Sequence, residues 1–197
     1  MQSTVPIRLG ATEGIKPISD VPRTLTGRVL VAVSATVFVA ACAHISLPLY
    51  FTPVPITLQT FAVILAGLFL GPALGFAALA LYLAEGAMGL PVFSPHSLGL
   101  LGPTAGYLFS YPLAAAAAGM VVRAIRRDAS KFPAAVLAGI AASVFIFIMG
   151  AGWLAHWLHL SPSAAWHMAV APFLPGEVLK VTAAAGAYTS MRRWRRF

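Results

Sequence analysis

The sequence predicts an all-α integral membrane protein, in which six transmembrane helices form a compact bundle and both termini are cytoplasmic. Of the 197 residues, 59% are hydrophobic and 9% are charged, whereas a soluble domain carries roughly 25% charged residues. Apolar runs of about 20 residues, long enough to cross a bilayer, recur along the chain. A transmembrane barrel would instead show alternating segments of about ten residues, and the sequence lacks them.

The segments follow one another from a polar, proline-bearing N-terminal tail, residues 1–24, which we expect to be cytoplasmic. Residues 25–197 then form a single six-helix membrane domain. Pro72 and Pro103 open two of the segments, in the first-turn position that proline favours. The predicted helices are residues 25–47, 57–71, 72–90, 103–125, 133–159 and 172–192.

The basic residues set the orientation, because cytoplasmic loops are enriched in Lys and Arg. They form three clusters: one before or at the start of the first segment, one between the fourth and fifth, and one after the sixth. With six crossings, all three clusters lie on the cytoplasmic side, so the net charge of +8 does not indicate nucleic-acid binding. Lys180 alone stands outside them. The cluster members are Arg8, Lys16, Arg23, Arg28, Arg123, Arg126, Arg127, Lys131, Arg192, Arg193, Arg195 and Arg196.

Lys180 and Glu177 interrupt the apolar sixth segment in its outer half. Their spacing of three residues puts them on one helix face, so they could pair for structural reasons alone. Ionisable groups inside a membrane are more often functional, however, since burying an ion there costs about 2.5–3.5 kcal/mol. Other polar residues are expected at a similar depth below the outer surface: Thr57, Gln59, Glu85, Thr104 and Tyr107.

These side chains predict a site for a small amphiphilic solute with an amide-like head. A carboxylate accepts N–H bonds, a lysine donates to carbonyl or carboxylate oxygens, and the neutral groups do both. The uncharged loops 48–56 and 91–102 are the expected lid, with Tyr50, Phe51 and Phe93 supplying apolar walls.

Enzyme and metal signatures are absent from the sequence. It contains no H-E-x-x-H, G-x-S-x-G or Walker motif, and His156 with His159 is better interpreted as an interfacial pair than as metal ligands. We expect no enzyme activity and no cofactor. Residues 39–42, VAAC, resemble a lipoprotein cleavage box, but short runs of small residues are common in membrane helices, and whether the first helix is cleaved stays open.

Small residues recur every four positions at Ala32, Thr36 and Ala40 in the first segment. Small-xxx-small faces allow helices to approach closely. Such a face serves either internal packing or the docking of a partner protein.

Four ordered motifs resemble the BioY family, and together they span most of the chain. They are 53-PVPITLQTFAVILAGLFLGPALG-75, 82-YLAEGAMGLPVF-93, 101-LGPTAGYL-108 and 172-PFLPGEVLK-180. The resemblance implies a biotin-specific substrate-binding (S) component of an energy-coupling factor (ECF) transporter, which captures biotin from outside. It also implies partnership with a transmembrane coupling protein and two ATP-binding cassette ATPases, although some family members function without them.

By position in these motifs, Gln59, Tyr107, Glu177 and Lys180 would line the biotin pocket. The last motif often carries Asp where this chain has Glu177, which keeps the carboxylate but changes its reach by one methylene. The family's small stripe on the first helix, which docks the coupling protein, has Thr36 at its middle position here. A different small vitamin as ligand, or an intramembrane enzyme acting on a small amphiphile, are the alternatives.

Overall fold

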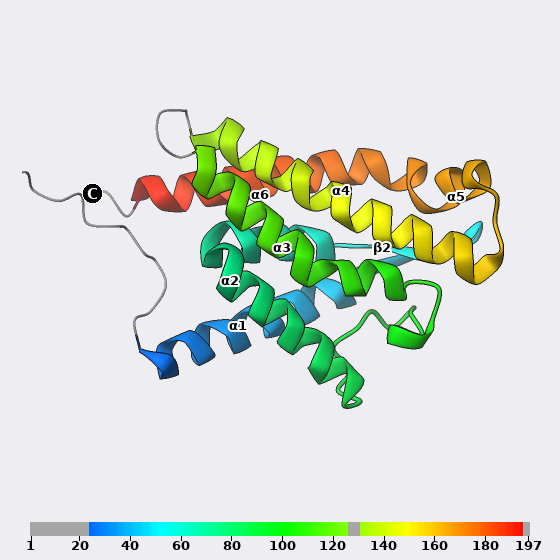
Figure 1. Ribbon diagram of the computed structural model, residues 1–197, viewed down its shortest axis with the longest axis horizontal. Helices are drawn as coiled ribbons and strands as arrows, with labels where there is room; N and C mark the ends of the chain where they lie inside the picture. The colour runs from blue at the N-terminus through cyan, green and yellow to red at the C-terminus, as the bar shows by residue number, and fades with distance from the viewer. Residues whose placement is uncertain (1–23, 126–130, 195–197) are drawn as a thin grey trace, which may run out of the picture.

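The computed structural model describes residues 24–125 and 131–194, and most of them are helical (Figure 1). The predicted tail, residues 1–24, therefore lies outside the described residues except for Thr24. The elements in chain order are α1 (Leu25–His44), β1 (Ser46–Leu49), β2 (Thr52–Thr57), α2 (Gln59–Ala87), η1 (Gly99–Leu101), α3 (Ala105–Ile125), α4 (Lys131–Leu158), α5 (Pro162–Ala169), η2 (Ala171–Phe173) and α6 (Leu174–Trp194).

Five helical stretches of the described chain are long and apolar enough to cross a membrane. Four of the six predicted segments correspond to α1, α3, α4 and α6, with ends that differ by a few residues. The last stretch, Pro162–Trp194, also includes α5 and η2. The second and third predicted segments are joined in one element, α2.

Gly71 interrupts α2 with non-helical backbone angles, φ 76° and ψ −178°, directly before Pro72. The predicted boundary between two helices thus falls at a real break. The two arms, residues 59–70 and 72–87, fold back on each other, because Gln59 Nε2 lies 2.7 Å from Tyr82 Oη across 23 residues of sequence. At 1.5 Å per residue the arms are about 18 and 24 Å long, so each is shorter than a hydrocarbon core of about 30 Å.

The Pro-rich segment after α1, which the sequence analysis treats as a loop, is instead a short antiparallel hairpin of β1 and β2. Ser46 pairs with Thr57 and Leu47 with Ile56. Prolines fit here because both strands are edges and need not donate every ladder hydrogen bond. The hairpin leads directly into Gln59, the first residue of α2.

Helix α3 runs through the middle of the bundle and makes its main contacts with α2 and α4 (Figure 1). Small residues allow this close packing: a Cβ added at Gly67 would collide with the carbonyl of Ala115, and one at Gly119 with the backbone of Gly71. Such small faces are typical of membrane helix packing. The core is consequently rich in buried alanine.

The beginning of α1 and the ends of α3 and α6 lie at the same end of the bundle, on the left of Figure 1. Arg28, Arg123, Arg192 and Arg193 are on these helix ends. Of the other basic residues in the three predicted clusters, Lys131 begins α4 and the rest lie outside the described residues.

Candidate functional site

The candidate site is a pocket bordered by residues from β2, the first turn of α2, the segment between α2 and α3, and helices α3, α4 and α6. The pocket has a volume of about 550 Å³ when its open mouth is included. The centre of a water molecule can occupy only about 50 Å³ of that volume without touching the walls. The pocket is therefore narrow, and side chains must move before a vitamin-sized ligand can enter it. The lining residues are Val54, Pro55, Thr57, Gln59, Thr60, Ser94, Ser97, Thr104, Tyr107, Leu108, Tyr111, Ile146, Phe147, Phe173, Glu177 and Lys180.

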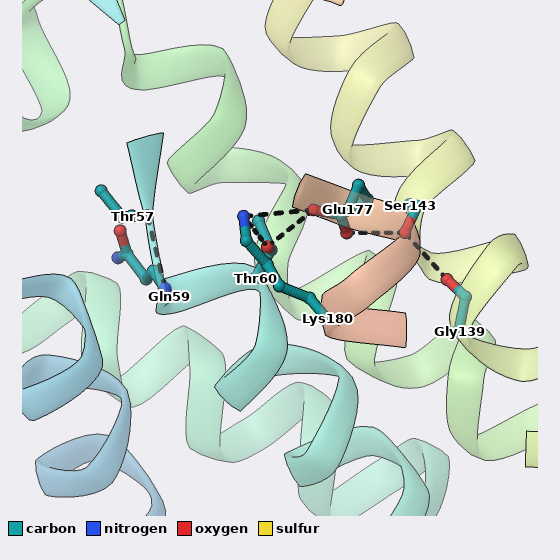
Figure 2. A network of polar contacts seen from close by, with 7 residues as sticks. All are labelled: Thr57, Gln59, Thr60, Gly139, Ser143, Glu177 and Lys180. Carbon is teal, nitrogen blue, oxygen red and sulfur yellow. Dashed lines mark hydrogen bonds and ion pairs between the residues drawn. The ribbon is translucent and has the colours of Figure 1, made fainter. Parts of the chain in front are cut away.

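Glu177 is the centre of a polar network that joins three helices (Figure 2). Its Oε1 accepts a hydrogen bond from Ser143 Oγ of α4 at 2.8 Å, and its Oε2 accepts one from Thr60 Oγ1 of α2 at 2.9 Å. The residue is 4% exposed. Glu177 also lies in the first turn of α6, at the positive end of the helix dipole.

Lys180 closes the network from one turn further along α6. Its Nζ lies 3.3 Å from Glu177 Oε2 and donates to Thr60 Oγ1 at 3.0 Å. The side chains of Lys180 and Glu177 are 12% and 6% exposed. Burying two charges costs more than their attraction returns unless both are well hydrogen-bonded, and here Thr60 and Ser143 supply those bonds. The result is an acceptor and a cationic donor fixed side by side.

Gln59 is held at the opposite end of the polar lining by its own neighbours. Its backbone N–H donates to Thr57 Oγ1 at 3.3 Å, and its side-chain Nε2 donates to Tyr82 Oη at 2.7 Å. One amide N–H is thus used, and the amide oxygen can accept from a ligand while the second N–H can donate.

Thr104 and Tyr107 line the pocket from the start of α3. The Tyr107 hydroxyl donates to the carbonyl of Ala169 at 2.6 Å, which ties α3 to the end of α5. Thr104 Oγ1 is buried and has no hydrogen-bond partner among the described residues. An unpaired buried hydroxyl is costly, so it marks a position where a ligand atom would improve the structure.

The structure brings together Thr57, Gln59, Tyr107, Glu177 and Lys180, as the sequence pattern predicts, but not Glu85. Glu85 does not line the pocket; its Oε1 instead accepts from Thr36 Oγ1 of α1 at 3.0 Å. Glu85 thus lies on the side of α2 that faces α1.

The expected lid aromatics are also outside the lining. Tyr50 and Phe51 are at the tip of the β1–β2 hairpin, where Tyr50 is 99% exposed and its ring contacts that of Phe51 edge to face. Phe93 packs against Tyr82, with 5.4 Å between ring centroids. The aromatic walls come from Tyr107, Tyr111, Phe147 and Phe173. The loops do contribute, however, through Val54 and Pro55 from the first and through Ser94 and Ser97 from the second.

Thr60 and Ser143 are functional candidates that the sequence analysis does not identify. Neither carries a charge, and hydroxyls in membrane helices commonly bond back to their own helix, as Ser143 also does to the carbonyl of Gly139 at 3.0 Å. The one available signal for Thr60 is its position next to Gln59.

The small stripe of α1 faces the interior of this structure. Ala32 and Thr36 are buried against α2, and Ala40 is half-buried. In this conformation the stripe therefore serves internal packing. A docking role for Ala32, Thr36 and Ala40 stays a prediction, which requires α1 to separate from α2.

No group of three or more His, Cys, Asp or Glu side chains that could hold a metal is found among residues 24–125 and 131–194. His156 and His159 are exposed near the end of α4, away from the pocket. Cys42, the single cysteine, is buried in α1.

Comparison with known proteins gives consistent results. The sequence model of the BioY family matches residues 13–197. The "Probable biotin transporter BioY" of Pyrococcus horikoshii is 38% identical over 135 residues, which cover 67% of this chain and 76% of that protein. The "Biotin transporter BioY" of Rhodobacter capsulatus is 37% identical over 167 residues, which cover 77% and 85%.

The fold also matches a solved structure, the S-component for biotin from an ECF-type ABC transporter. The TM-score is 0.77, with 85% of this chain and 92% of that chain covered. At 23% sequence identity, this likeness establishes the architecture only.

Proposed function

The chain belongs to the BioY family, and on that premise we propose that it is the membrane-embedded biotin-binding component of a biotin uptake system. BioY proteins are transporter components rather than enzymes, and the several long apolar helices make this chain a multi-pass membrane protein. The observation that carries the proposal is the pairing of a buried carboxylate, Glu177, with a cationic donor, Lys180, in one pocket.

The chemistry of this pair suits biotin. The ureido ring presents N–H donors beside a carbonyl acceptor, so a carboxylate and an ammonium group can bind its two sides. We assign Glu177 to accept from a ureido N–H and Lys180 to donate to a ligand oxygen, either of the ureido carbonyl or of the valerate. The oxygen of Gln59 and the free hydroxyl of Thr104 supply further neutral contacts. Phe147, Phe173 and Tyr111 supply an apolar wall for the thiophane ring and the aliphatic tail.

Biotin binding requires part of the present network to open. Thr60 and Lys180 both contact Glu177 Oε2, so a ureido N–H replaces one of these contacts or joins them. Such an exchange keeps the carboxylate satisfied in both states, which limits the desolvation cost of binding. Because these side chains bond to one another in this conformation, the free volume of the pocket is small.

We further propose that biotin enters from the outer side of a prokaryotic plasma membrane and that both termini are cytoplasmic. Supporting this orientation, the described arginines of the three basic clusters are at one end of the bundle, as the positive-inside rule requires. The pocket is lined by residues at the starts of α3 and α6, whose other ends carry Arg123, Arg192 and Arg193. The segments 48–56 and 91–102 then act as a lid, since both contribute to the lining.

The partners in this scheme are a transmembrane coupling protein and ATP-binding cassette ATPases of the ECF type. This part of the proposal rests on the family and on the fold of the matching S-component. Uptake of labelled biotin should be measured in cells without a biotin transporter of their own, with this chain expressed alone and together with ECF partners. Uptake that depends on the chain supports the function, and a difference between the two arms establishes the need for partners. No uptake in either arm by a chain present in the membrane contradicts the proposed function.

A further inference from the structure

Tyr82 is fully buried in the second arm of α2 and does not line the pocket. Its hydroxyl nevertheless touches two parts of the site. It accepts from Gln59 Nε2 at 2.7 Å and donates to the carbonyl of Val92 at 2.7 Å. Gln59 is a lining residue, and Val92 belongs to the segment between α2 and α3 that covers the pocket.

We propose that Tyr82 is a positioning residue, whose hydroxyl orients the Gln59 amide and fastens the covering segment 88–104 over the pocket. The orienting role rests on the proposed biotin-binding function, whereas the fastening role does not depend on the ligand.

The orientation of Gln59 follows from hydrogen-bond accounting. A phenol has one hydrogen to donate, and Tyr82 gives it to Val92, so toward Gln59 the phenol oxygen acts as an acceptor. It therefore bonds to the amide nitrogen of Gln59 and leaves the amide oxygen of this lining residue to accept from a ligand. A buried acceptor held in this way favours a ligand that presents N–H groups.

The covering segment is fastened at a second point beside the hydroxyl. The ring of Phe93 packs on that of Tyr82 at 81° and 5.4 Å between centroids, and Gly86, one turn along the same arm, leaves the space that Phe93 fills. Ser94 follows immediately and is buried in the lining. Loss of the Tyr82 hydroxyl thus loosens the segment next to Ser94 and Ser97, which line the pocket.

The first test compares Tyr82→Phe with Tyr188→Phe in the full chain purified in detergent. Tyr188 is equally buried, but it lies on α6 against Phe69, away from the pocket. We expect Tyr82→Phe to weaken biotin binding by about 5- to 10-fold, the worth of one ordinary hydrogen bond, and Tyr188→Phe to leave it unchanged. Gln59→Leu provides the mechanism test: combined with Tyr82→Phe, its effect should be smaller than the product of the two single effects. Unchanged affinity in Tyr82→Phe, or a fully multiplicative double variant, overturns the orienting role.

The second test needs no biotin. Ser94→Cys in a Cys42→Ala background places the only thiol in the buried part of the covering segment, and its rate of reaction with a maleimide reports opening. Tyr82→Phe should raise that rate several-fold, as should Phe93→Leu, which loosens the same contact with the hydroxyl intact; Tyr188→Phe should not. Equal rates in all variants overturn the fastening role. If the unmodified chain binds no biotin, the proposed function fails, while the labelling rates still decide whether Tyr82 holds the segment.

Discussion

Glu177 Oε2 and Lys180 Nζ lie 3.3 Å apart on successive turns of α6, and Thr60 of α2 bonds to both. Glu177, Lys180 and Thr60 thus form a three-residue unit that spans two helices, rather than a local contact within one helix. Because each polar group in it is satisfied, the pair persists in the bundle interior at low cost and keeps an acceptor and a donor ready for a ligand.

Replacing Lys180 by Ala should weaken biotin binding by about 2–5 kcal/mol, because Glu177 is left buried beside the ligand without its cation. Equilibrium binding of labelled biotin to the purified variant measures the loss. Thr182→Ala is the matched control, since Thr182 is exposed on the same helix and its hydroxyl donates to the carbonyl of Val178. An unchanged affinity in a folded Lys180→Ala variant would show that Lys180 does not contribute to biotin binding.

Ser143→Ala should also weaken binding, by about 1–3 kcal/mol, because a hydrogen bond to a buried carboxylate is lost. Ser110→Ala is the control: Ser110 is fully buried in α3 and donates to the carbonyl of Tyr107, whereas Ser143 donates to Glu177. Titration with biotin should separate the two variants by about 5-fold or more. Equal losses would mean that Ser143 contributes only to packing.

Thr104→Val should separate a ligand contact from a structural one. Its hydroxyl has no partner among the described residues, so removing it should leave Tm without biotin unchanged or higher, because an unpaired buried group disappears. The biotin-induced rise in Tm should shrink, with affinity lower by about 5- to 10-fold. A variant with lower Tm and full affinity would assign Thr104 to the fold instead.

Glu85→Gln tests whether Glu85, which lies outside the pocket lining, contributes to biotin binding. Since Glu85 contacts Thr36 of α1 and not the pocket, biotin affinity should stay within about 2-fold of the unmodified chain, as for substitutions distant from a site. Glu177→Gln, the same chemical change inside the pocket, should weaken binding strongly. If both variants lose affinity equally, Glu85 contributes to the site in a conformation other than this one.

Gly71→Ala should destabilise the bundle by about 1–3 kcal/mol, because the residue adopts φ 76° and a side chain there meets the guanidinium of Arg123. Gly176→Ala, in the first turn of α6 with no atom within 4 Å of the added carbon, should be neutral or slightly stabilising. Thermal unfolding in detergent compares them. A Gly71→Ala variant as stable as Gly176→Ala would show that the fold-back of α2 does not depend on this glycine.

Hydrophobic length predicts most of the fold, because spanning helices need long apolar runs. The break in α2 is also predictable, since the pair Gly71-Pro72 combines a residue that tolerates positive φ with one that lacks an N–H. The β1–β2 hairpin is not, because 48-PLYFTPVP-55 carries the turn-forming prolines typical of a loop. The short helix α5, PSAAWHMA, has eight residues, too few to form the long apolar run by which the spanning helices are predicted.

Charge identifies the centre of the site but not its surroundings. Glu177 and Lys180 stand out in an apolar segment, so the sequence alone marks them as candidate site residues. Glu85 is equally conspicuous, yet the direction in which a side chain points around its helix depends on the packing partner, and α1 lies on that side. Thr60 and Ser143 are ordinary helix residues until α2, α4 and α6 bring them together around one carboxylate.

The most direct measurement is equilibrium binding of labelled biotin to the purified chain in detergent, challenged with excess unlabelled biotin, riboflavin or thiamine, and repeated with Glu177→Gln and Lys180→Ala. The account predicts tight binding that only unlabelled biotin displaces and that both substitutions weaken strongly. Displacement by riboflavin or thiamine, or no binding by a folded and monodisperse sample, would contradict it.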